Sequence, residues 1–116
     1  MQIQFNTDSN IEGRDELARW VEDATAKALG HFGDRITRLE VHLSDINAHK
    51  SGQDDIRCLL EARPARRKPV AVSHRAGTIE QAVNGATEKL KRALDSTFSR
   101  LGSRQRTATF SDDSGE

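Results

Sequence analysis

The feature that most constrains the fold is one long apolar stripe in the second half of the chain. Its side chains recur at three- and four-residue steps over about six helical turns, at Ile79, Ala82, Val83, Ala86, Leu90, Leu94, Phe98 and Leu101. This spacing predicts an amphipathic helix that must lay its apolar side on another element. Thr78 followed by Gln81 fits a capping box at its start, and Gly102 is well placed to end it.

A second, shorter stripe predicts another helix earlier in the chain. It consists of Leu17, Trp20, Val21, Ala24 and Ala28, with Leu29 and Phe32 at its end. Gly13 is a suitable N-cap for this helix. Gly30 and Gly33 bracket its end, because glycine commonly terminates helices.

Four other segments alternate between apolar and polar side chains, which is typical of half-buried strands. They are residues 1–7, 36–43, 56–63 and 70–75. The polar stretch 45–55 and the basic stretch 64–69 are expected to connect strands.

The order strand, helix, three strands, helix predicts an α+β two-layer sandwich with a four-stranded sheet. Both helices must cover the apolar face of the sheet. The crossover at the start favours a parallel first pair of strands, followed by an antiparallel meander. The opposite face of the sheet then carries Arg38, His42, Arg57 and Arg63 toward solvent.

Length, cysteine content and hydropathy indicate a single-domain protein without disulfides or membrane-spanning segments. A chain of 116 residues is expected to form one domain. Its one cysteine, Cys58, has no internal disulfide partner and falls on the apolar side of a strand, so we interpret it as a small core residue. No signal peptide and no membrane-spanning segment is recognisable, which predicts a cytoplasmic protein.

The formal net charge is zero, but the charges are unevenly distributed. Residues 1–56 carry a balance of −5, residues 57–75 of +5, residues 76–88 of −2, residues 89–106 of +5 and residues 107–116 of −3. Two basic blocks are thus concealed within a neutral average.

The two basic blocks are candidates for RNA contacts. Lys89 and Arg92 share a helix face, Lys91 flanks it, and Arg100 and Arg104 extend it toward the helix end. The first block lies on the connection and strand before that helix, at Arg63, Arg66, Arg67, Lys68 and Arg75. Chain neighbours are usually spatial neighbours, so one patch that contacts phosphates is plausible. A solvated charged face explains the same residues equally well.

The scarcity of aromatic side chains bears on the kind of RNA. The chain has four Phe, one Trp and no Tyr, mostly at core positions. This disfavours readers of single strands that stack bases on aromatic rings, and it favours recognition of folded RNA by shape and phosphates.

Signatures of catalysis are missing from the sequence. There is no glycine-rich phosphate loop, no nucleophile elbow and no pair of Cys or His at metal-ligand spacing. The histidines at 31, 42, 49 and 74 fall in separate elements and are interpreted as ordinary surface residues. A nuclease would need a cluster such as Arg38, Glu40 and His42. We expect no enzyme activity, no metal or cofactor, no membrane partner and no small-molecule substrate.

Several motifs together resemble a known family. Residues 31–36, His-Phe-Gly-Asp-Arg-Ile, resemble the aromatic–x–Asp–Arg–Ile passage of the ribosome hibernation factors, also described as sigma-54 modulation proteins. Residues 79–83 and 88–94 are similar to the final helix of that family, with its Lys-Leu-x-Arg-x-Leu segment. Residues 104–110 are similar to the tail of its short members. The family usually has a tyrosine where this chain has Ile79 and Glu80.

The resemblance implies a fold and a function. The fold is that of double-stranded-RNA-binding domains, here over residues 1–102, with a flexible tail at 103–116. The function is silencing of translation in stress or stationary phase, by binding rRNA of the small ribosomal subunit where tRNA and mRNA would lie. Lys89 and Arg92, and less directly Lys91, match the rRNA contacts of the family. The alternative is a protein-interaction module or homodimer of the same fold, in which the exposed fourth strand pairs edge to edge.

Overall fold

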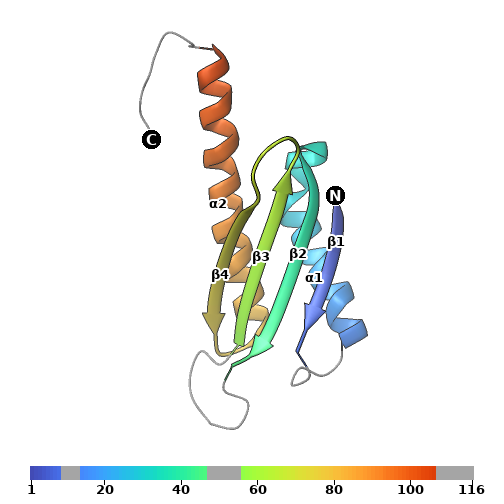
Figure 1. The fold of residues 1–116 in the computed structure, drawn as a ribbon. Coiled ribbons are helices and arrows are strands. Elements are labelled where there is room, and N and C mark those ends of the chain that lie inside the picture. The colour runs from blue at the N-terminus through green and yellow to red at the C-terminus, as the bar shows by residue number, and fades with distance from the viewer. Residues whose placement is uncertain (9–13, 47–55, 107–116) are drawn as a thin grey trace.

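The structure, a computed structural model, describes residues 1–8, 14–46 and 56–106, with side chains up to Ser99. The elements follow the order β1 (Gln2–Thr7), α1 (Arg14–Leu29), the 3-10 segment η1 (Gly30–Arg35), β2 (Ile36–Asp45), β3 (Ile56–Pro64), β4 (Val70–Ala76) and α2 (Ile79–Arg106). Figure 1 shows this order from the sheet side. The predicted β-α-β-β-β-α arrangement is confirmed.

The four strands form one mixed sheet in the order β1-β2-β3-β4. β1 pairs with β2 in parallel, and β2, β3 and β4 form an antiparallel meander. β1 and β4 are therefore the two edge strands. This is the predicted topology, because the β1–β2 connection contains a helix, α1, that crosses back over the sheet as a parallel pair requires.

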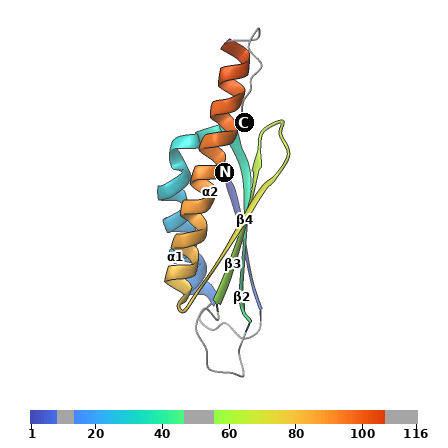
Figure 2. The same cartoon turned by 90° about the vertical axis from the view of Figure 1, so that its left-hand side faces the viewer.

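Both helices lie on the same face of the sheet, as Figure 2 shows in side view. The core lies between the two layers and is made of the alternating inward side chains of the strands and the apolar sides of the helices. Its fully buried members include Val21, Leu29, Ile36, Leu39, Val41, Leu60, Val83, Leu90 and Leu94. The predicted stripes thus face the sheet; Leu101, the last residue of the long stripe, has a side chain outside the described residues.

Cys58 is one of these core residues, as predicted. Its side chain is inaccessible to solvent. Burial raises the pKa of its thiol to about 12, because desolvation disfavours the thiolate. The thiol therefore stays protonated and unreactive at neutral pH.

The connection between α1 and β2 depends on a glycine and an arginine. Gly33 has a φ of 57°, a left-handed conformation that glycine adopts without strain. The guanidinium of Arg35 lies over two rings, with its Cζ 4.7 Å from the Phe98 centroid and 5.4 Å from the Phe32 centroid. Its Nε also donates to the Phe32 carbonyl at 3.1 Å. The cation–π contacts of Arg35 thus hold η1 against α2, so its charge stabilises the fold.

The start of α2 follows the prediction, but its end does not. The Gln81 N–H donates to Thr78 Oγ1 at 3.1 Å, as in a capping box. The helix continues through Gly102 to Arg106, so the expected end at Gly102 is wrong. A glycine inside a helix costs only about 1 kcal/mol, which the neighbouring helix-forming residues can offset. Residues 107–116, the remainder of the expected tail, lie outside the described residues.

Replacing the cap residue tests the start of α2. Thr78→Ala is expected to lower the free energy of unfolding by about 1 kcal/mol, because the Gln81 N–H loses its acceptor. Urea unfolding measures this loss. The matched control is Ser96→Ala at an exposed position inside the same helix, where alanine should be neutral or slightly stabilising. Equal stability of Thr78→Ala and the native protein would contradict the role of the cap.

Within the residues described, neither helix is long and apolar enough to span a bilayer.

Candidate nucleic-acid interface

Lys89 and Arg92 lie on the side of α2 that is next to the edge strand β4. The Lys89 Nζ donates a hydrogen bond to the Ser73 carbonyl of β4 at 3.0 Å. Gly85, one turn before Lys89, packs directly against the ring of His74 on the same strand. Arg92 follows Lys89 by three residues, so it shares this side of the helix, and it is exposed.

Lys91 lies on the other flank of α2. Two residues correspond to about 200° around a helix axis, which turns Lys91 away from Lys89. One turn further on, Asp95 lies 3.8 Å from Nε2 of His31 in η1, so this flank faces the first half of the chain. Lys91 is half-buried there. It therefore does not extend the surface formed by Lys89 and Arg92.

The connection between β3 and β4 exposes three consecutive cations, Arg66, Arg67 and Lys68. The Arg67 N–H donates to the Pro64 carbonyl at 3.3 Å, which closes a tight turn. Arg66 has a φ of 63°, where glycine would carry less strain. In Figure 2 this hairpin leans away from the helix layer.

Arg63 and Arg75 lie on the face of the sheet that the helices leave open. Arg75 is exposed and directly opposite Arg57 of β3. Arg63 has its Nε 3.9 Å from Oε2 of Glu40, so a carboxylate already neutralises part of its charge. The sequence pattern placed Arg57 and Arg63 on this face, but only the strand register shows that Arg57 meets Arg75.

Six of the predicted residues surround β4, and we refer to them as the β4 cations: Arg66, Arg67, Lys68, Arg75, Lys89 and Arg92. They come from the β3–β4 hairpin, from β4 and from α2. None of them has a carboxylate of the described residues within ion-pair distance. Arg100 and Arg104 belong to α2 as well, but their side chains lie outside the described residues.

The residues considered for catalysis form an ion-pair group. Glu40 lies 3.0 Å from Arg38 Nη2 and 3.4 Å from His42 Nε2. No cluster of three or more potential metal ligands occurs among the described residues, and His49 lies outside them. Because Arg38 and Arg63 both lie within ion-pair distance of Glu40, its charge is balanced by guanidinium groups and the carboxylate is not an unpaired base.

The element order, the mixed sheet and the one-sided helix layer define the chain as a two-layer α+β domain of the β-α-β-β-β-α type. A family model described as sigma 54 modulation protein / S30EA ribosomal protein matches residues 3–101. The chain belongs to this family, which is ribosome-associated and is not a family of enzymes. The resemblance seen in the sequence is thereby confirmed.

Two solved structures share the fold. One is the protein Y N-terminal domain of Thermus thermophilus, with 20% identity and a TM-score of 0.63, over 80% of this chain and 94% of that chain. The other is a ribosomal subunit interface protein from Coxiella burnetii, with 15% identity and a TM-score of 0.63, over 85% of this chain and 99% of that chain. No curated protein was found to match the chain.

Proposed function

We propose that this protein is a translation-silencing factor that binds rRNA of the small ribosomal subunit and occludes the sites of tRNA and mRNA. It acts by occupying space, so it needs no catalytic group. This role places it in the cytoplasm and in conditions such as stress or stationary phase, when protein synthesis is reduced. The proposal rests on membership of a ribosome-associated family together with the β4 cations.

The observation that carries the proposal is the lack of carboxylate partners at the β4 cations. Lys and Arg side chains that are already ion-paired must give up a partner before they bind phosphate, whereas these need not. Lys89 and Arg92 form the centre of the proposed contact, and the hairpin cations extend it. Arg63 contributes less because Glu40 engages it, and Lys91 less because of its position on the other flank.

The left-handed backbone at Arg66 is a second argument. An arginine there costs about 1 kcal/mol that glycine would avoid. Strained positions of this kind cluster at functional sites. A cation in this conformation in the β3–β4 hairpin therefore supports a role in binding.

Salt-dependent co-sedimentation tests the function. We expect the protein to pellet with small ribosomal subunits at low salt and to be released progressively as salt rises, because phosphate contacts release counterions. If each of the six β4 cations neutralises one phosphate, the slope of log affinity against log salt should be about −5. Affinity that does not change with salt, or no pelleting at the lowest salt, would contradict the proposal.

The alternative of an edge-to-edge homodimer is less well supported. β4 is an edge strand, but Lys89 already occupies the Ser73 carbonyl that a second strand would need. Light scattering with and without RNA separates the two. A dimer that is indifferent to RNA would favour the alternative.

A further inference from the structure

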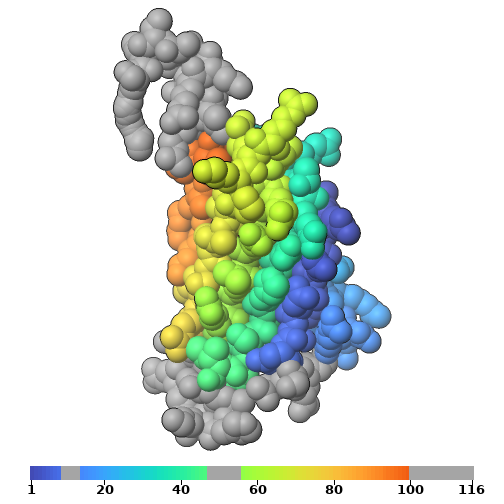
Figure 3. Space-filling model, in the orientation of Figure 1, coloured from blue at the N-terminus to red at the C-terminus, as the bar shows by residue number. Residues whose placement is uncertain are grey.

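The open face of the sheet carries two pairs of arginines, and each pair is held in register on neighbouring strands. Arg57 of β3 is opposite Arg75 of β4, and Arg38 of β2 is opposite Arg63 of β3. Arg57 and Arg63 are six positions apart along β3, which is roughly 20 Å along a strand. Figure 3 views this face, over which the strands lie uncovered by the helices.

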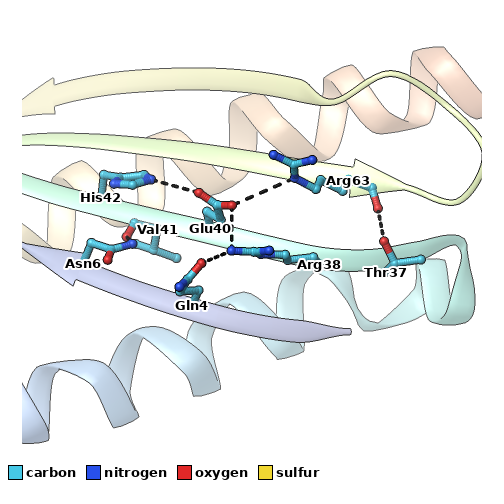
Figure 4. Close-up of polar contacts among 8 residues, drawn as sticks. All are labelled: Gln4, Asn6, Thr37, Arg38, Glu40, Val41, His42 and Arg63. Carbon is cyan, nitrogen blue, oxygen red and sulfur yellow. Dashed lines mark hydrogen bonds and ion pairs between the residues drawn. The ribbon is translucent and has the colours of Figure 1, made fainter.

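The Arg38/Arg63 pair is neutralised from within the sheet. Glu40 reaches Arg38 at 3.0 Å and Arg63 at 3.9 Å, and its side chain is only 16% exposed. Gln4 of β1 accepts a further hydrogen bond from Arg38. Figure 4 shows Glu40 between the two guanidiniums, with His42 on its other side.

The Arg57/Arg75 pair has no such partner. Both side chains are exposed, and no carboxylate in the described parts of the chain lies within ion-pair distance of either. Like charges directly opposite each other on adjacent strands are destabilising. An anion between them would remove this repulsion, and guanidiniums bind phosphate in a bidentate geometry.

We propose that Arg57 and Arg75 form a second phosphate-binding site, which takes the sugar–phosphate backbone of RNA on the open face of the sheet. This inference rests on the proposed function. It extends the RNA-binding surface around the β4 edge, from Lys89 in the helix layer to the open face of the sheet. Leu59 and Ser73 occupy the next cross-strand position and offer no aromatic ring for base stacking, and the imidazole of His42, opposite Leu59, is engaged by Glu40. The site therefore contacts the backbone and not the bases.

The two arginine pairs supply a matched experiment. Arg57→Ala/Arg75→Ala and Arg38→Ala/Arg63→Ala each remove two positive charges from the same face. The probes are an RNA duplex of about 20 base pairs, long enough for a domain of this size, and small ribosomal subunits. The first variant should flatten the slope of log affinity against log salt by about 2 and weaken binding by tenfold or more at 0.1 M salt. The second should change the slope by less than half as much.

The outcomes separate this inference from the proposed function. Equal effects of the two variants, or no effect of Arg57→Ala/Arg75→Ala on duplex binding, would overturn the sheet site. Failure of the native protein to bind the duplex at low salt would overturn it as well. Failure to bind small subunits while the duplex data hold would overturn the proposed function alone. Thermal unfolding of each variant establishes that it is folded.

Glu40 provides the converse test. Glu40→Gln keeps the size of the side chain and removes its charge, so it frees Arg38 and Arg63 for phosphate. We expect duplex affinity to rise by about tenfold, with a steeper salt slope. Adding Arg38→Ala/Arg63→Ala to Glu40→Gln should cancel the gain. An unchanged affinity of Glu40→Gln would show that the carboxylate does not limit binding on this face.

Discussion

Gly85→Ala is expected to destabilise the protein by about 1 to 3 kcal/mol, the usual cost of overpacking. In an ordinary helix interior the same substitution stabilises by about 1 kcal/mol. The sign is reversed here because a Cβ at residue 85 would lie 2.6 Å from Cγ of His74 and closer still to other ring atoms. The ring lies between β4 and α2, so a Cβ at residue 85 requires the ring to turn or α2 to move away from the sheet.

Two variants show whether His74 is the cause. In a His74→Ala background, Gly85→Ala should recover much of the lost stability, because the new methyl group enters the space of the ring. Gly30→Ala serves as a matched control, since nothing lies within 4 Å of its Cβ position. Chemical denaturation measures all of them. A stabilising Gly85→Ala would mean that the ring turns aside at little cost.

Charge reversal of Lys89 and Arg92 is expected to lower the affinity for small ribosomal subunits on the order of a hundredfold at 0.1 M salt. Two lost phosphate contacts account for most of this, and repulsion by the new carboxylates for the rest. Reversal keeps a charged side chain beside the edge of β4, which disfavours pairing with another strand, although a carboxylate cannot replace the hydrogen bond to the Ser73 carbonyl. Both positions are exposed, so the free energy of unfolding should change little.

The control with the same change in net charge reverses Arg19 and Lys27, which are exposed on α1; Lys27 also loses its 3.1 Å ion pair with Asp23, so unfolding is measured alongside binding. Arg19→Glu/Lys27→Glu changes the net charge by the same amount at a surface distant in sequence from the β4 cations. Filter binding or co-sedimentation across a salt series compares the two variants. If both lose affinity equally, net charge and not the position of Lys89 and Arg92 governs binding.

The elements of the fold were predictable from side-chain periodicity. Alternation over four segments and two apolar stripes are enough to assign strands and helices, and the helix between the first two strands requires a parallel pair. The error at Gly102 shows the limit of local signals. A single glycine lowers helix propensity only slightly, so its neighbours decide whether the helix continues.

The candidate site was less predictable because it depends on register and on rotation about the helix. A period of two assigns Arg57 and Arg63 to one face, but it cannot show that Arg57 meets Arg75 while Arg63 meets Glu40. Only the pairing of strands supplies this. The position of Lys91 could have been predicted from the sequence. A rotation of about 100° per residue already places it on another side of the helix from Lys89.

The hydrogen bond from Lys89 to the Ser73 carbonyl makes one side chain responsible for both the solubility of the protein and its proposed RNA contact. A bare strand edge is a template for aggregation, and a lysine ammonium on it is one of the ways in which proteins prevent this. The side chain proposed to bind RNA is therefore also the one that prevents self-association of the protein through β4. Exchange for an uncharged residue at this position threatens both properties at once, whereas another long cation preserves both.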